Sequence, residues 1–317
     1  MRNTKMDSVK TFLIFMVILG HVIAPYKSGT LNDVNLFVET IIFSFHMPLF
    51  VMISGYFCHY TQKPGSFVKR LLELLATFVV FQLIKVVISG DYSLASFLTP
   101  KYTLWYILCL VYWRIYVYLL AKRLPWGVIL AIAVAISLGA GFLPYKLLSF
   151  QRACAFLPFF VFGTMMHEFK LTEKIDRIKP EYALGAVIIC LTLFVFMEHS
   201  IGVNLKKDIL IAKTMYSGAL GILWRSVWLL LATVISLGVY RLVPDSPRLA
   251  KYGAATLTIY MFHPFFTKQF PYLLDATPIP NDLLVNVLYS FLVFAVCILL
   301  SKSRIVGYIV KPLRLSK

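Results

Sequence analysis

Two long apolar segments near the start of the chain carry ionisable side chains in their interiors. The segments are residues 9–25 and 36–57, and their ionisable residues are Lys10, His21, Glu39 and His46. Crossing a lipid bilayer takes about 20 mostly apolar residues, and both segments are long enough. An ionisable group inside such a segment is costly and by default marks a functional site. The pair of segments therefore predicts a membrane protein with a polar site inside its helices.

The spacing of these residues predicts how they lie in the membrane. Lys10 and His21 are eleven residues apart, about three turns plus 20°, so they share one helix face with a rise of about 16 Å. If Lys10 lies at one surface, His21 lies near the middle of the membrane. His46 follows Leu36 by ten residues and descends about 15 Å from the opposite surface. We expect the two histidines to meet at mid-depth, with Glu39 on the same face as His46 to orient its imidazole.

Each of these residues also has a purely structural interpretation. A buried histidine can simply hydrogen-bond a neighbouring helix, and Lys10 alone could extend to the headgroups as an ordinary positive-inside lysine. Two histidines converging at one depth favour function, because a histidine near its ordinary pKa can take a proton from a hydroxyl group at neutral pH. Asp7 could hold Lys10 in place or merely mark the start of the helix.

The composition extends this interpretation to the whole chain. Of 317 residues, 60% are hydrophobic and 14% are charged, whereas a soluble domain is about half apolar. We expect one all-α, polytopic integral-membrane domain over residues 1–317, and we expect residue 9 onward to remain as a span rather than a cleaved signal. The apolar runs predict about ten transmembrane helices, at 9–25, 36–57, 70–88, 103–120, 126–143, 151–166, 181–197, 216–240, 252–268 and 283–300.

The net charge of +17 follows membrane topology rather than nucleic-acid binding. With the N-terminus in the cytoplasm, 20 of the Lys and Arg residues fall in inside connections and seven in outside connections. This asymmetry predicts that both termini are cytoplasmic. It places Lys10 at the cytoplasmic surface. The five scattered cysteines contain no CxxC pair and are expected to be buried thiols, with no metal site.

Several stretches resemble one known family. MDSVKTFLIFMVILGH followed by FSFHMPLFVMISGYF resembles the integral-membrane acyltransferase 3 family, and within it the fucose 4-O-acetylase-like branch. Members carry a basic residue, ten residues and then His in the first helix, and FHMPLF with SG in the second. TLWYILCLVYWR, RACAFLPFFVFG and AATLTIYMFHPFF resemble later blocks, so the resemblance covers most of the chain. Lys10 departs from the Arg of many members, and Glu73 stands where a second basic residue is common.

The resemblance implies transfer of an acyl group from acyl-coenzyme A to a hydroxyl group, usually of a sugar. Coenzyme A phosphates would meet Lys10 and the pair Lys69 and Arg70. Arg114 could bind a phosphate or pair with Glu73. On the acceptor side, Arg152 could bind the sugar or reach the outer headgroups, and His263 could contact the acceptor or be structural. The histidines expected to be merely solvated are His59, His167 and His199.

We therefore expect a multi-pass O-acyltransferase of the inner membrane that uses acetyl-coenzyme A from the cytoplasm and no metal. His21 would be the general base, and His46 with Glu39 would position or polarise the reacting group. The expected partners are the acyl donor, a sugar or glycan acceptor and the bilayer, without nucleic acid. Two alternatives remain: a transporter or flippase that uses the same ionisable groups as a relay, and a succinyltransferase of the same fold. The acceptor and a covalent acyl-enzyme are both left open.

Overall fold

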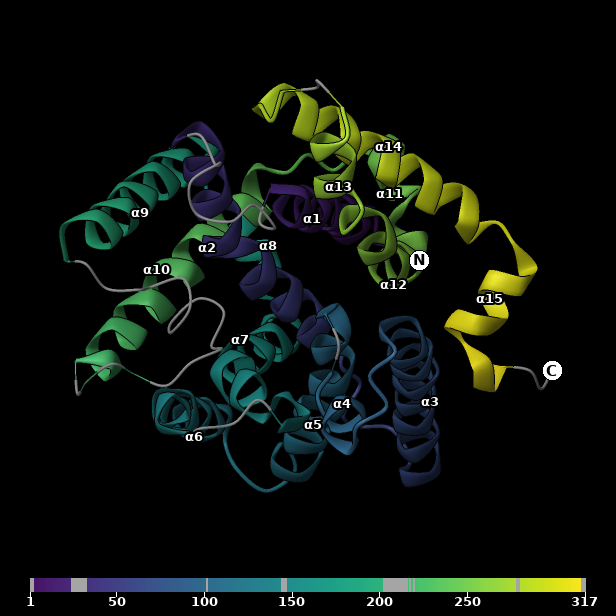
Figure 1. Cartoon of the computed structure of the whole chain (residues 1–317). Coiled ribbons are helices and arrows are strands. Elements are labelled where there is room, and N and C mark those ends of the chain that lie inside the picture. Colours follow the sequence, from purple (N-terminus) through teal and green to yellow (C-terminus); the bar gives the residue numbers. More distant parts are fainter. Residues whose placement is uncertain are drawn as a thin grey trace. The chain divides into compact units, whose positions relative to one another are not determined.

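The computed structural model describes residues 3–23, 33–100, 102–143, 147–201, 216, 218, 220–277 and 280–314. Within these ranges the regular structure is helical and contains no strand (Figure 1). The chain divides into two compact units, and each is described by itself. Unit 1 comprises Met1–Met47 and Val243–Val310, and unit 2 comprises Pro48–Leu242 and Lys311–Lys317. The boundary falls inside the helix α2, Asp33–Tyr56, next to Pro48.

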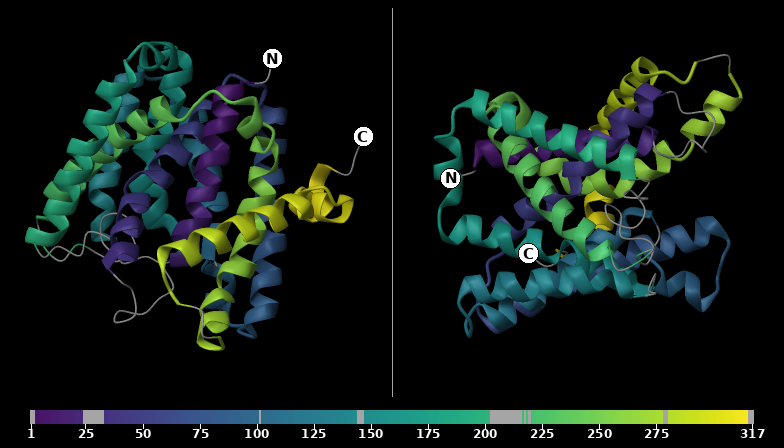
Figure 2. Two further views of the ribbon diagram at one scale, coloured as in Figure 1. Left: turned by 90° about the horizontal axis from the view of Figure 1, so that it is seen from above. Right: turned by 90° about the vertical axis from the view of Figure 1, so that its left-hand side faces the viewer.

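Unit 1 is built from the two ends of the sequence. Its helices are α1 Thr4–Ile23, the first part of α2, α11 Pro247–Ala250, η5 Gly253–Ala255, α12 Thr256–Thr267, α13 Phe270–Asp275, α14 Leu283–Ser301 and α15 Arg304–Val310. α1, α12 and α14 pack on one another, and the views of Figure 2 show them side by side. Leu19, Ile23 and Ile42 form the apolar centre between α1, α2 and α14.

Unit 2 holds the middle of the chain. Its longer helices are the rest of α2, α3 Pro64–Ser89, α5 Trp105–Leu120, α6 Trp126–Gly139, α7 Phe150–Glu168, α9 Pro180–Ile201 and α10 Gly221–Leu242. Its shorter elements are α4 Leu94–Leu98, η1 Tyr102–Leu104, η2 Ala140–Phe142, η3 Leu147–Ser149, α8 Leu171–Asp176 and η6 Pro312–Arg314. α7 is largely buried among its neighbours.

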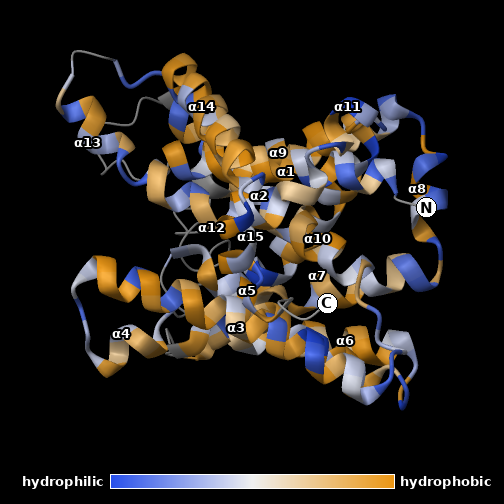
Figure 3. Ribbon diagram, turned by 90° about the vertical axis from the view of Figure 1, so that its right-hand side faces the viewer, coloured by the Kyte–Doolittle hydropathy of each residue, from blue (hydrophilic) through white to orange (hydrophobic). Residues whose placement is uncertain are grey.

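The outer faces of the long helices are apolar, as a bilayer requires. Large hydrophobic side chains stay exposed on α9 and α14, including Ile189, Phe196, Leu284 and Leu299, and Figure 3 shows hydrophobic residues along α14 and α3. Within the described residues, seven helices are long and apolar enough to cross a membrane, and 126–142 is a shorter apolar helix. The chain is therefore an all-α polytopic membrane protein.

All ten expected segments contain a helix in the described residues, but three of them differ from a simple span, and one of these is the shorter helix at 126–142. α12 has 12 residues, a rise of about 18 Å, which is short for a bilayer. α7 has the length but carries Arg152, His167 and Glu168, which lower its hydropathy. The number of spans and the side on which the termini lie remain predictions.

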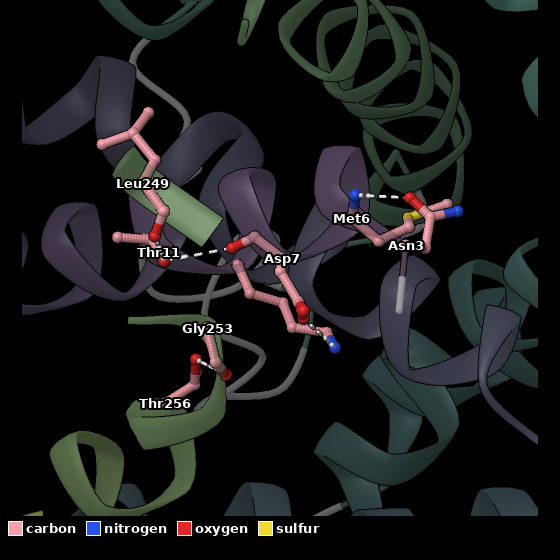
Figure 4. Close-up of polar contacts among 8 residues, drawn as sticks. Asn3, Met6, Asp7, Thr11, Leu249, Gly253 and Thr256 are labelled. Carbon is pink, nitrogen blue, oxygen red and sulfur yellow. Dashed lines mark hydrogen bonds and ion pairs between the residues drawn. The ribbon is translucent and has the colours of Figure 1, made fainter. Parts of the chain in front are cut away.

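α1 is tied along its first half to the segment that follows α10. Three side chains, one turn apart, donate hydrogen bonds to backbone carbonyls, and in each pair the two residues are 238 positions apart in the sequence. The pairs are Lys5 with Val243, Ser8 with Ser246 at 2.9 Å, and Thr11 with Leu249 at 2.9 Å. The constant separation means that this segment runs parallel to α1 and in step with it; Figure 4 shows Thr11 and Leu249 together. These bonds explain why α1 begins at Thr4, before the apolar run expected from residue 9.

In unit 2, the second part of α2 and α7 meet backbone to backbone. A Cβ added at Gly163 would lie 1.9 Å from the carbonyl oxygen of Met52, and one added at Gly55 would lie 2.0 Å from that of Phe160. Thr164 donates its hydroxyl to the carbonyl of Gly55 at 3.2 Å. Only glycine allows helices to approach so closely.

Candidate active site

The parallel register of unit 1 brings two histidine rings together. His21 near the end of α1 stacks on His263 of α12, with ring centroids 5.4 Å apart and ring planes 25° apart. His263 is fully buried, and its Nδ1 lies 3.0 Å from the carbonyl oxygen of Ile259. A carbonyl only accepts, so Nδ1 carries the proton and Nε2 is the basic nitrogen of the neutral ring. The sequence left His263 open between contact with the acceptor and a structural role; the structure makes it the ring partner of His21.

The two other candidate residues of unit 1 lie on α2, on either side of its contact with α1. Ile42 and Phe43 would touch a Cβ at Gly20, the neighbour of His21, at 3.2 and 3.3 Å. Glu39 and His46 each lie about one turn from this contact. Both are buried, with 0% and 3% of their surfaces exposed, on one face of the helix as expected.

His46 is fixed by contacts within its own helix. Its Nδ1 lies 2.7 Å from the carbonyl oxygen of Ile42, so this nitrogen carries the proton. The ring meets Phe43 edge to face, with centroids 4.9 Å apart. The ring of His21 stacks on His263 of α12, and the meeting of His21 with His46 at mid-depth remains a prediction.

The predicted anchor of Lys10 is present. Lys10 Nζ lies 3.1 Å from Asp7 Oδ1, with 24% of the lysine side chain and 8% of the aspartate side chain exposed. Asp7 in turn packs on Gly253, where a Cβ would come within 2.7 Å of Asp7 Cβ, and Thr256 donates to the carbonyl of Gly253 at 2.8 Å. Figure 4 shows Asp7 beside this turn. The ammonium group is thus held by a buried carboxylate and keeps part of its side chain accessible to a ligand.

In unit 2, α3 and α5 place two of the predicted phosphate ligands at one level. Phe67 stacks on Tyr118 with centroids 3.9 Å apart, and Lys85 lies 5.1 Å from the ring of Tyr102, so the helices run antiparallel. Arg70 follows Phe67 by three residues and Arg114 precedes Tyr118 by four, which brings both to about the same depth. Lys69 and Arg70 are exposed, and Arg114 is half-buried.

The alternative pairing of Arg114 with Glu73 is absent from the described residues. No ion pair joins the two, and the buried Nε of Arg114 has no hydrogen-bond partner there. A half-buried guanidinium without a carboxylate is suited to an anionic ligand. The structure therefore favours the phosphate interpretation of Arg114, and contact with coenzyme A remains a prediction.

Two histidines that the sequence set aside lie in the same region of unit 2. His59 and His167 are both exposed, as expected, but their rings lie 6.3 Å apart. Partial burial lowers the pKa of His59, and the positive charges of Arg70, His167 and Arg114 lower it further. Tyr60 beside them donates to Glu168 at 2.7 Å. The pKa of His59 therefore responds to the positive charges of Arg70 and Arg114.

Two further arginines of unit 2 lie against aromatic rings. The guanidinium of Arg152 lies 5.0 Å from the ring centroid of Trp105. Arg225 is fully buried and lies 5.2 Å from the ring of Trp228 and 5.9 Å from that of Tyr216. These are cation–π contacts, and a role for Arg152 in acceptor binding remains a prediction.

The cysteines are free and buried, as the sequence predicted. Within the described ranges, no group of three His, Cys, Asp or Glu side chains is close enough to hold a metal ion. The ionisable groups of the candidate site are the stacked pair of His21 and His263 and the cations, of which Lys10 is held by Asp7.

A polytopic helical protein with buried histidines and cations held near helix ends has the features of a membrane enzyme. The comparison with protein families is more specific. A family model described as an acyltransferase domain, Acyl_transf_3, matches residues 3–302. The chain belongs to this family of membrane acyltransferases, and the match spans both units. No curated protein and no solved structure matches the chain.

Proposed function

We propose that this protein is an O-acyltransferase of the inner membrane that moves an acetyl group from cytosolic acetyl-coenzyme A to a hydroxyl group of a sugar or of an exported polysaccharide. The observation that carries the proposal is the stacking of the His21 ring on the His263 ring. His21 shares one face of α1 with Lys10, whose ammonium group is held by Asp7. The resemblance to the fucose 4-O-acetylase-like branch supports a sugar acceptor.

The reaction needs one proton acceptor and no external redox partner. A histidine Nε2 takes the proton of the acceptor hydroxyl as its oxygen attacks the thioester carbonyl carbon. The new C–O bond forms, the C–S bond breaks, and the departing thiolate receives the proton from the imidazolium. His21 is the proposed base, because it is half-buried and so remains reachable by substrate. His263 positions it through the stack, and the bond to Ile259 fixes the orientation of His263.

The donor is recognised through its phosphates. Lys10 is one proposed cation contact for these phosphates, and the further proposed contacts are Lys69, Arg70 and Arg114. The rise of about 16 Å between Lys10 and His21 allows an extended pantetheine arm to place its thioester near the histidine. Glu39 and His46, buried one turn on either side of the contact with α1, complete the polar interior and are proposed to position or polarise the reacting groups.

The family assignment supports acyl transfer over the transporter alternative. A succinyl or other short acyl group would require the same base and the same phosphate contacts, so acetyl is the proposed group on the strength of the resemblance. A comparison of acetyl-coenzyme A and succinyl-coenzyme A as donors for the purified protein separates the two.

The test is donor-dependent release of coenzyme A by purified protein in detergent, with and without a sugar acceptor. His21→Ala should lower turnover by about 10²- to 10⁴-fold, the usual contribution of a positioned base. His263→Ala and His46→Ala should also be severely impaired, and Glu39→Gln less so. Lys302→Ala is the control, because Lys302 is exposed after α14. If folded His21→Ala keeps near-normal turnover, His21 is a packing residue and the base must be His263 or His46.

A further inference from the structure

Three asparagine side chains lie together in unit 1 where α2 and α14 begin. Asn35 is in the first turn of α2, Asn281 precedes α14, and Asn286 is in its first turn. Asn35 and Asn286 are fully buried. A buried amide is costly unless its donors and acceptors are bonded, so the pairing of each atom matters.

The hydrogen bonds fix how each amide is turned. Asn35 Nδ2 donates to the backbone carbonyl of Asn281 at 3.4 Å, which turns Asn35 Oδ1 toward Asn286. Asn286 Nδ2 donates to this oxygen and to Asn281 Oδ1, both at 3.2 Å. Two atoms then remain: Asn281 Nδ2 and Asn286 Oδ1 are buried and have no hydrogen-bond partner within the described residues. The cluster thus leaves one donor and one acceptor on adjacent amides.

The cluster lies near the candidate active site of the same unit. Glu39 follows Asn35 by four residues on α2, about 6 Å along the helix. On the other side, Tyr289 of α14 donates its hydroxyl to the carbonyl of Phe266 at 3.0 Å. Asn286 precedes Tyr289 by three residues, and His263 precedes Phe266 by three. The helices that carry Asn35 and Asn286, α2 and α14, therefore pack against the helices of the histidine pair, α1 and α12.

We propose that Asn281 and Asn286 bind hydroxyl groups of the acceptor sugar, neighbours of the hydroxyl that is acylated. Each sugar hydroxyl both donates and accepts a hydrogen bond, so adjacent hydroxyls satisfy Asn281 Nδ2 and Asn286 Oδ1 together. A phosphate or carboxylate brings only acceptors and leaves Asn286 Oδ1 unbonded. The ligand class is a neutral polyhydroxy compound, and this inference rests on the proposed function.

The sharpest test is Asn281→Asp. This change keeps an oxygen that accepts from Asn286, replaces the unpaired Nδ2 donor with a second oxygen and adds a negative charge. The probes are methyl glycosides of glucose, galactose, mannose and N-acetylglucosamine. For a glycoside that the wild type uses, Asn281→Asp should raise the KM roughly tenfold, the effect of one lost buried hydrogen bond, and leave hydrolysis of acetyl-coenzyme A without glycoside unchanged. Asn281→Ala should do the same.

Ser290→Ala is the matched control, because Ser290 lies one turn further along the same buried face and its hydroxyl donates to the carbonyl of Asn286 at 2.7 Å. It should leave the KM for the glycoside unchanged. A wild-type KM in both Asn281 variants overturns the proposal, and so does an equal loss of hydrolysis and transfer, which indicates a structural cluster. Glycoside binding is measured separately by saturation-transfer NMR. A wild type that binds none of the glycosides also overturns the proposal, whereas Asn281-dependent binding without acyl-coenzyme A turnover counts only against the proposed function.

Discussion

Lys10 forms a salt bridge to Asp7 and still keeps part of its side chain exposed. Lys10→Ala should weaken acetyl-coenzyme A binding by about 10- to 100-fold, because a charge-assisted hydrogen bond contributes about 1.5–3 kcal/mol. Lys10→Arg should retain most of the affinity, since it also presents a cation to phosphate. The measurement is the dissociation constant of acetyl-coenzyme A by calorimetry.

Lys302→Ala provides a control for the loss of one positive charge, because Lys302 is exposed after α14. An unchanged affinity in Lys10→Ala would leave Lys10 with only the role of a headgroup-facing lysine.

His59 offers a residue-level test of the phosphate contacts in unit 2. Its pKa lies below the ordinary 6.5 because of partial burial and the charges of Arg70, His167 and Arg114. A bound polyanion offsets those charges and raises the pKa of His59, so the imidazole takes up protons on binding. By linkage, coenzyme A should bind more tightly as pH falls below about 6.5.

Calorimetry at pH values on either side of 6.5 measures this dependence. His59→Gln should reduce it, and Arg114→Gln should weaken binding at both pH values. The same pH dependence in His59→Gln and wild type would show that coenzyme A binds away from Arg70 and Arg114.

At the scale of elements, the crossing of α2 and α7 depends on two glycines. Gly163→Ala places a Cβ 1.9 Å from the carbonyl oxygen of Met52, so the helices must separate, at a cost of about 1–3 kcal/mol or more. The thermal unfolding temperature in detergent should fall. Gly185→Ala is the matched control, because Gly185 is inside α9 with nothing within 4 Å of an added Cβ. It should match or slightly exceed the wild type. Equal unfolding temperatures for the two variants would contradict the close contact.

The positions of the long helices were predictable from sequence, because apolar runs of this length have few other solutions in a membrane. The early start of α1 was not, since Lys5 and Ser8 donate hydrogen bonds to a segment 238 residues away, which no local pattern reveals. The pairing of His21 with His263 was missed for the same reason. Helix spacing places His21 and His46 in depth, but only tertiary packing decides which ring meets His21.

For the whole molecule, the basic residues predict the orientation in the membrane. A cysteine at Lys207, which lies outside the described residues, should react with an impermeant thiol reagent from outside, and one at Lys174 in α8 should not. The five native cysteines are buried, so they contribute little background. The reverse pattern would put Lys10 on the side without coenzyme A.

The discontinuity of unit 1 has a consequence for the timing of synthesis. Its two parts are separated by residues 48–242, and translation at about 5–20 residues per second takes about 10–40 seconds to make that stretch. During this interval α1 has been made, but the segment whose carbonyls accept hydrogen bonds from Lys5, Ser8 and Thr11 has not. His263, the ring partner of His21, is also still missing. A ribosome that stops early releases a chain in which the candidate catalytic residues of unit 1 have not come together. We therefore expect activity only after Val243–Val310 has packed against Met1–Met47.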